Sequence, residues 1–191
     1  AYGYRAVTND TVREGVGNFS NNLGEPLTFV NHVLQGQIPD AGATFGRFVV
    51  NTTVGIAGIF DPASAMGMQR TREDFGQTLG KWGVQSGPYL VLPFLGPSSP
   101  RDAVGMGTDL ALNPLNYPEF ESDDEIRLGV AALGGINARE GAIEAIDEVR
   151  NQIDPYTTVR RLYDRTRQQD IANAPVQPKE TEKVPESELD F

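Results

Sequence analysis

The stretch that decides the fold is residues 10–36, DTVREGVGNFSNNLGEPLTFVNHVLQG. Apolar residues recur in its first half at spacings of four, three and four, which places them on one face of a helix: Val12, Val16, Phe19 and Leu23. Gly24 offers a left-handed cap and Pro26 a first-turn position, so a second helix is expected to run up to Gly36. The sequence therefore predicts two amphipathic helices joined by a tight turn.

A third helix is predicted to start at Asp40 and to continue to Phe60. Its last part, VGIAGIF over 54–60, is apolar on all sides, which is typical of a helix that is buried or touches lipid. Asp61 precedes Pro62 and is expected to end the helix, because a residue before proline disfavours the helical region. The apolar run over 48–60 is shorter than the roughly 20 residues a spanning helix needs, so no helical membrane crossing is expected.

Glycines are dense over 76–96, which predicts a loop or hairpin there, with PYLVLP over 88–93 as a short extended run. Cap and proline signals predict three further helices, over 99–112, 122–152 and 154–172. The middle one opens with the capping box Ser122-Asp-Asp-Glu125 and is expected to kink at Gly134-Gly135.

The length of 191 residues favours one domain, and we predict a single all-α domain over 1–172. Residues 173–191 contain three prolines and an excess of acids, which predicts a disordered acidic tail. Several amphipathic helices, a short apolar segment and a glycine-rich hairpin suit either a protein in a membrane interface or an ordinary helical core. The pattern alone leaves both possibilities open.

Composition excludes several chemistries. The 16 basic and 26 acidic side chains give a net charge of −10, which argues against a nucleic-acid partner. With no Cys and one His, thiol nucleophiles and multi-His metal sites are excluded, and neither metal nor cofactor is expected. His32 is the only candidate base for a serine hydrolase, and we interpret it as a helix-face residue.

The charged clusters are better explained by helix capping, solvation or ion pairing than by catalysis. The acids at 123–125 fit a helix start better than a metal site, and Glu144, Asp147 and Glu148 fit a solvated helix face. The four arginines of the last helix either pair with neighbouring acids or meet phosphate groups: Arg160, Arg161, Arg165 and Arg167.

Four blocks in order resemble one known family: YRAVTNDTVREGVGNFSNNLGEPLTFVNHVLQG, GRFVVNTTVGIAGIFDPAS, FGQTLGKWGVQSGPYLVLPFLGPSSPRDAVG and DPYTTVRRLYDRTRQQDIANA. They are similar to the MlaA (VacJ) family of Gram-negative outer-membrane lipoproteins. The resemblance implies a helical ring in the inner leaflet of the outer membrane, bound to trimeric porins. It also implies non-enzymatic removal of misplaced outer-leaflet phospholipid through an amphipathic channel, with transfer to the soluble periplasmic carrier MlaC.

The resemblance assigns roles to two segments. Gly83 and Gly87 match the family's channel hinge, although they are also read as simple turn residues, and Gln85 stands where relatives can have a further glycine. The lipid path or hairpin is expected to include Pro88, Tyr89, Leu90 and Leu92. The charged segment before the hairpin is expected to contact porins: Arg70, Thr71, Arg72, Glu73 and Asp74. The acidic tail is expected either to reach the carrier or to be a solvated end.

The family's signal peptide, lipobox cysteine and N-terminal segment are absent from the sequence, and the intact protein is expected to be lipid-anchored on the periplasmic side. Two other functions remain open at this point. One is a structural, porin-associated lipoprotein without transport. The other is a lipid hydrolase with His32 as its base.

Overall fold

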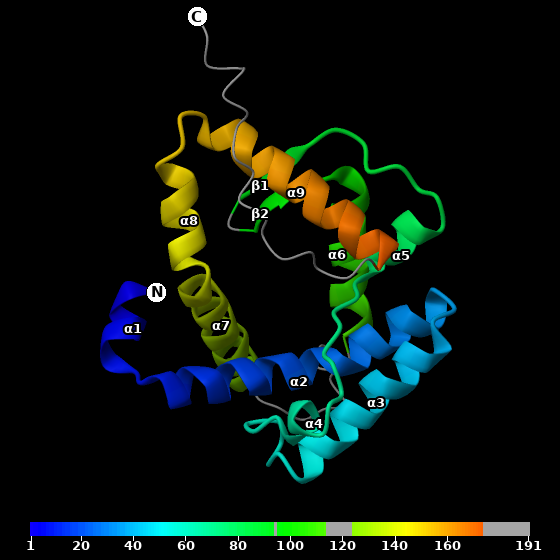
Figure 1. Cartoon of the computed structure of the whole chain (residues 1–191), viewed down its shortest axis with the longest axis vertical. Coiled ribbons are helices and arrows are strands. Elements are labelled where there is room, and N and C mark those ends of the chain that lie inside the picture. Colours follow the sequence, from blue (N-terminus) through cyan, green and yellow to red (C-terminus); the bar gives the residue numbers. More distant parts are fainter. Residues whose placement is uncertain (94, 114–123, 174–191) are drawn as a thin grey trace, which may run out of the picture.

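The computed structural model describes residues 1–93, 95–113 and 124–173. Apart from one two-stranded hairpin, the regular elements in these residues are helices, and together they form a ring (Figure 1). In chain order they are α1 (Tyr2–Val7), α2 (Asp10–Leu34), α3 (Ile38–Thr53), α4 (Pro62–Ala65), α5 (Phe75–Lys81), β1 (Leu90–Leu92), β2 (Gly96–Ser98), α6 (Pro100–Leu112), α7 (Asp124–Gly141), α8 (Ile143–Arg150) and α9 (Pro155–Ala172).

Four sides frame the ring in Figure 1. The long helix α2 forms one side, α7 and α8 the next, α9 the third and α6 the fourth. Helix α3 packs along the outside of α2, and the hairpin contacts α9. This arrangement confirms the predicted all-α ring with a short hairpin. Within the described residues, no helix has both the length and the hydropathy needed to cross a bilayer.

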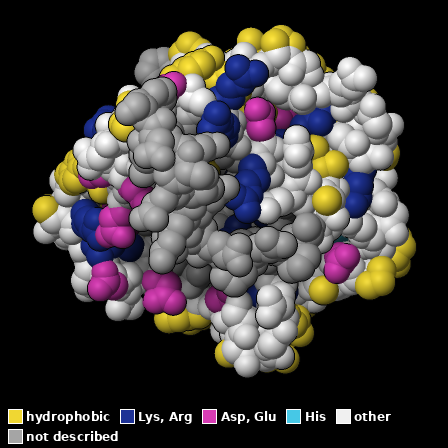
Figure 2. Space-filling view, turned by 45° about the horizontal axis from the view of Figure 1, so that its top comes forward, with side chains coloured by type: hydrophobic (Ala, Val, Ile, Leu, Met, Phe, Trp, Pro, Cys, Tyr) yellow, Lys and Arg dark blue, Asp and Glu magenta, His cyan; other side chains and the backbone are white. Residues whose placement is uncertain are grey.

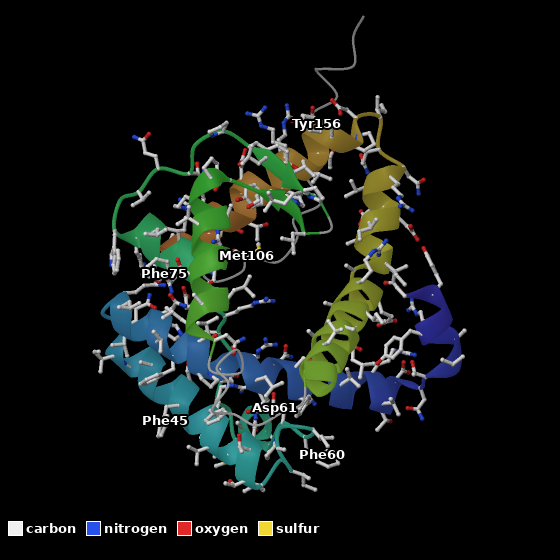
Figure 3. The ribbon with its side chains drawn as sticks, turned by 180° about the vertical axis from the view of Figure 1, so that it is seen from behind. Phe45, Phe60, Asp61, Phe75, Met106 and Tyr156 are labelled. Carbon is white, nitrogen blue, oxygen red and sulfur yellow. The ribbon has the colours of Figure 1, made fainter. Side chains whose placement is uncertain are left out.

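The interior of the described part of the chain is polar. Its buried hydrophobic residues are Ala41, Ala63 and Ile143, whereas the buried faces of α2 and α3 carry Asn22, Glu25, Thr28, Asn31, His32, Thr44, Arg47 and Asn51. The apolar stripes face outward, and Phe45 and Phe60 at the outer edge in Figure 3 are each 55% exposed. This outward orientation favours the membrane-interface alternative over an ordinary helical core, because exposed apolar patches of this kind mark contact surfaces.

The predicted turn at Gly24-Pro26 is wrong, because α2 continues from Asp10 to Leu34 with Pro26 inside it. A helix-interior proline costs about 3 kcal/mol through its missing N–H and its ring clash. Contacts with α3 on both sides of the proline offset that cost: Arg47 Nε donates to Glu25 Oε1 (3.3 Å) before it, and Phe29 packs against Phe45 after it with ring centroids 5.9 Å apart.

The predicted helix up to Phe60 is also too long, since α3 ends at Thr53. Residues 54–60 form turns in which Ile56, Ala57 and Gly58 have positive φ. Gly58 packs so closely on α2 that a Cβ there would lie 2.4 Å from Asn22 Cβ. Asp61 ends no helix and instead caps α4, accepting a hydrogen bond from the backbone N–H of Ser64 (3.0 Å).

The first part of the glycine-rich segment is a helix, α5, and not a loop. Asp74 caps it by accepting from Gln77 N (2.9 Å). Gly76 allows close packing, because a Cβ on Gly105 of α6 would lie 2.3 Å from Gly76 N. The extended run is confirmed in the hairpin, where β1 and β2 pair antiparallel with Leu90 opposite Ser98.

Local start signals succeeded elsewhere. Ser99 caps α6, which ends at Leu112, and Asp154 caps α9, which ends at Ala172. The predicted kink at Gly134-Gly135 is wrong, since the break falls at Ala142 between α7 and α8. Gly134 instead lets α7 approach α2, with a would-be Cβ 3.2 Å from Ser20 Oγ. Ser122 and Asp123 of the capping box, and the tail from residue 174, lie outside the described residues.

Candidate functional site: the central cavity

A cavity of about 680 Å³ lies in the middle of the ring. Its wall combines α2, residues 70–74, β2, α6, α7 and Arg167 of α9. Figure 2 shows Lys and Arg side chains near the middle of the hollowed face and hydrophobic side chains toward the margins. Met106 of α6 faces this opening in Figure 3. The fold brings these segments together from five separated regions of the chain.

One side of the ring is fixed by Arg47, which is 2% exposed between α2, α3 and α4. Its guanidinium donates to Glu25 Oε1 (3.3 Å), to Asp61 Oδ2 (3.0 Å), to Ser64 Oγ (3.1 Å) and to the Met68 carbonyl. A buried guanidinium costs several kcal/mol unless paired in this way. Arg47 therefore ties three helices to the start of the segment that leads into the cavity wall.

The two acids beside Arg47 differ in pKa. Burial raises the pKa of Glu25 although Arg47 opposes the rise. Asp61 is also desolvated, but hydrogen bonds from Ser64, Asn51 and Arg47 outweigh burial and lower its pKa to about 2. Asp61 is thus the firmly ionised partner of Arg47.

The opposite side of the ring is closed by Arg167 of α9. Its Nη1 donates to Asp74 Oδ2 (2.7 Å) and its Nη2 to Asp74 Oδ1 (2.6 Å), a bidentate pair with the cap of α5. Nη2 also donates to Asp102 Oδ1 (3.0 Å) on α6. A bidentate arginine pair adds geometric specificity to its energy, so α9 is held to α5 and α6 at a fixed orientation.

Asp102 is the shared acceptor of this closure. It accepts from Arg101 Nε (2.9 Å), from Arg167 and from the Tyr163 hydroxyl. Burial opposes ionisation of Asp102, but these donors lower its pKa to about 2. Burial and the bond to Asp102 raise the pKa of Tyr163 to about 12.

The ring is also closed between its N-terminal part and α7. Tyr4 donates to Asn137 Oδ1 (3.2 Å), and Arg5 Nε pairs with Glu140 (3.2 Å). Glu144 pairs with Arg5 (3.2 Å) and Asp147 accepts from Tyr2 (2.8 Å), so these two acids of the expected solvated face also join α1 to α8.

The predicted hinge glycines both have positive φ, +89° at Gly83 and +75° at Gly87. Gly83 follows α5 with open space around it, whereas a Cβ on Gly87 would lie 3.1 Å from Pro100 Cγ. Both positions therefore favour glycine, since other residues rarely adopt this conformation. Their role as a hinge stays a prediction.

The predicted lipid-path residues lie in the hairpin and outside the described lining of the cavity: Pro88, Tyr89, Leu90 and Leu92. Tyr89 packs edge-on against Tyr156 and Tyr163 of α9, with ring centroids 5.8 Å and 5.7 Å apart. The second strand lines the cavity instead, through Pro97 and Ser98. A lipid path along the first strand stays a prediction.

The segment predicted to contact porins runs along the cavity wall. Glu73 is 6% exposed and accepts from Gln35 Nε2 (2.8 Å), and Asp74 is held by Arg167. Thr71 lies 2.9 Å from Nε2 of His32, while Arg70 and Arg72 line the cavity. Contact of this segment with a porin stays a prediction.

His32 is fully buried, and its Nδ1 lies 2.6 Å from Gln37 Oε1. With Thr71 at its other nitrogen, both ring nitrogens are engaged inside the protein. A base needs a nitrogen within hydrogen-bond reach of a substrate proton. The hydrolase alternative thus lacks support from the geometry.

Sequence reasoning missed the pairing of Asp61 with Arg47 and the other buried or half-buried ionic residues in and around the cavity wall: Glu25, Arg47, Arg101, Asp102 and Asp109. The sequence left open whether the arginines of the last helix pair with acids or meet phosphate groups, and Arg167 pairs with Asp74. A usable signal was present in α2, where Asn22, Glu25, Thr28 and Asn31 recur every three residues. Such spacing marks a polar helix face as clearly as apolar residues mark an apolar one.

Comparison with known proteins agrees with this architecture. The family model described as MlaA lipoprotein matches residues 1–170. The chain belongs to the MlaA lipoprotein family. An uncharacterized protein of Rickettsia typhi is 40% identical over 90% of this chain and 68% of its own length.

Two further MlaA relatives are informative. The intermembrane phospholipid transport system lipoprotein MlaA of Escherichia coli K12 is 36% identical over 85% of this chain and 64% of its own length. A chain solved in work on the structural basis for maintenance of bacterial outer membrane lipid asymmetry superposes with a TM-score of 0.76 at 31% identity. That match covers 89% of this chain and 85% of the other. The MlaA fold therefore extends over the ring described above.

The pairing of Asp102 predicts a pH-dependent loss of stability in Asp102→Asn. The folded-state pKa of about 2 lies below the ordinary 3.8, so the carboxylate stabilises fully above about pH 4 and loses this effect as pH falls through 2. Chemical unfolding in detergent should show a loss of about 2 kcal/mol at pH 6 that shrinks toward pH 2. The exposed Asp164→Asn variant is the control for the lost charge. An Asp102→Asn defect that does not change with pH would contradict this.

Proposed function

We propose that this protein transports phospholipid at the outer membrane of a Gram-negative bacterium, without covalent chemistry. It removes misplaced phospholipid from the outer leaflet through the central cavity and passes it to the soluble periplasmic carrier MlaC, which maintains lipid asymmetry. Relatives at 32–36% identity are named intermembrane phospholipid transport system lipoproteins, which supports the substrate class.

The observation that carries this proposal is the reversed polarity of the ring. Its interior is polar and charged, whereas large apolar side chains on its outer edge are exposed, such as Phe45, Ile56 and Phe60. A charged headgroup in hydrocarbon costs several kcal/mol or more without substitute hydration. A polar cavity inside an apolar rim supplies such hydration to the headgroup and leaves the acyl chains near lipid.

The apolar rim also supports the proposed location, in the inner leaflet of the outer membrane on the periplasmic side. Val49, Val54 and Ile59 extend the exposed apolar surface beside Phe45 and Phe60 on the α3 side of the ring. Amphipathic helices of this kind bury their apolar faces at the boundary of headgroups and acyl chains. The lipid anchor of the intact protein and binding to trimeric porins are further parts of the proposal.

Access to the cavity is proposed to depend on the hairpin. Gly83 and Gly87 bracket the connection between α5 and β1, and β2 contributes Pro97 and Ser98 to the cavity wall. A rotation about these glycines would therefore move part of that wall. Open space around Gly83 makes it the freer of the two positions.

Deleting the gene for this protein should raise the phospholipid exposed at the cell surface, because misplaced lipid is no longer removed. The measurement is digestion of surface phospholipid by an added phospholipase, with re-expression of the full-length protein as the control. Unchanged surface phospholipid in the deletion strain would contradict transport and favour the structural alternative. Release of lysophospholipid from vesicles by the purified protein would instead support the hydrolase.

The hinge predicts that Gly83→Ala lowers surface clearing in the same assay. An alanine at positive φ costs about 1–2 kcal/mol and resists rotation. Gly67→Ala is a matched control, because Gly67 also has positive φ (+83°) and open space around it. Both variants should unfold at similar temperatures, and only Gly83→Ala should clear less lipid. Equal clearing by the two variants would mean that Gly83 is a turn residue only.

A further inference from the structure

Each carboxylate that lines the cavity already accepts at least one hydrogen bond from the protein, although Glu25 Oε2 has no partner among the described residues. Glu25 accepts from Arg47, Glu73 from Gln35, and Asp74 from Arg167. Asp102 accepts from Arg101 and Arg167, and Asp109 accepts from the backbone N–H of Phe75 (3.0 Å). Each acid of the wall thus already has a donor within the protein.

Not all of the cationic side chains that line the cavity have acidic partners among the described residues. Three arginines line it, and Arg167 is committed to Asp74 and Asp102. Within the part of the chain that the structure describes, no carboxylate lies within ion-pair distance of Arg70 or Arg72. Both arginines line the cavity, and neither guanidinium has a hydrogen-bond or ion-pair partner among the described residues.

Neighbouring residues hold the two arginines in place. Arg47 donates a hydrogen bond to the Met68 carbonyl, Thr71 contacts His32, and Glu73 accepts from Gln35 at the end of α2. The residues that alternate with Thr71 and Glu73 therefore face away from these contacts, toward the cavity. Because Arg70 and Arg72 are two positions apart, their Cα atoms are at most about 7 Å apart. They are close enough for both guanidiniums to reach one anion.

We propose that Arg70 and Arg72 form a binding site for the phosphodiester group of a phospholipid inside the cavity. This rests on the proposed transport function and names the group that the cavity recognises. Arginine presents a planar fork of donors that matches phosphate oxygens bidentately. The site requires the phosphate and not a particular headgroup, because Arg70 and Arg72 are the cationic groups of the described lining that have no acidic partner there.

The surroundings of Arg70 support an anionic ligand. Burial lowers the pKa of Arg70, and the nearby positive charges of Arg72 and Arg47 lower it further, against the effect of Glu25. Arg70 is exposed where it lines the cavity, so a phosphate can reach it and would compensate these neighbouring positive charges.

The test measures binding to the full-length protein in detergent by titration calorimetry with three probes. These are dihexanoyl phosphatidylglycerol, dihexanoylglycerol, which lacks the phosphate, and inorganic phosphate. The doubly substituted Arg70→Gln/Arg72→Gln should bind the phospholipid at least about tenfold more weakly than the unaltered protein, because it lacks the charge-assisted hydrogen bonds to the phosphate. Dihexanoylglycerol should bind both proteins equally.

Matched variants separate the site from general charge effects. Arg161→Gln/Arg165→Gln removes two exposed arginines of α9 that lie outside the lining, and it should bind like the unaltered protein. Arg70→Lys/Arg72→Lys keeps both charges without the fork and should bind with intermediate affinity. Circular dichroism and unfolding temperature show whether each variant retains the fold.

Each contrary result has its own meaning. Equal phospholipid affinity in a folded Arg70→Gln/Arg72→Gln protein would overturn the site. Binding of inorganic phosphate without phospholipid would overturn the lipid as the source of the anion. If the unaltered protein clears surface phospholipid in cells but binds neither dihexanoyl phosphatidylglycerol nor inorganic phosphate, the site fails and the transport proposal stands. If it does not clear surface phospholipid, the transport proposal fails first.

Discussion

The buried pairing of Arg47 with Glu25 and Asp61 is the interaction on which the ring depends. Helices α2 and α3 meet through their polar faces, and a guanidinium that is 2% exposed is tolerated there only because acceptors surround it. Once the polar faces are turned toward each other, the apolar faces must point outward. The same rule holds at Arg167, where a second paired guanidinium joins α9 to α5 and α6 and closes the ring.

This reversed polarity connects the structure to its proposed task. An apolar rim needs a lipid environment, and a cavity with charged walls suits a headgroup that must cross hydrocarbon. The ring can therefore be stable and functional only where both surroundings are available. Glycines at close helix crossings, such as Gly76 against Gly105, let the walls approach without bulky apolar side chains between them.

Much of the fold was predictable because its signals are local. The caps at Ser99 and Asp154, and the extended run in the hairpin, need only a few neighbouring residues. The failures involve tertiary contacts: Pro26 stays inside α2 because α3 contacts Glu25 before it and Phe29 after it, and Gly76 serves close packing inside α5. The polar interior was missed because amphipathic periodicity does not tell which helix face is buried. Resemblance drew attention to residues 70–74, but only the structure places Arg70 and Arg72 at the cavity.

Site-directed spin labelling in bilayers tests the reversed polarity most directly, since the sequence has no native cysteine to interfere. Single labels at Phe45→Cys and Ile56→Cys report on the rim, and labels at Ser20→Cys and Asn21→Cys report on the cavity wall. The rim labels should be more accessible to oxygen, which partitions into lipid, and the cavity labels to a water-soluble nickel chelate. Rim labels that are as accessible to the nickel chelate as the cavity labels would contradict a ring with its apolar side in lipid.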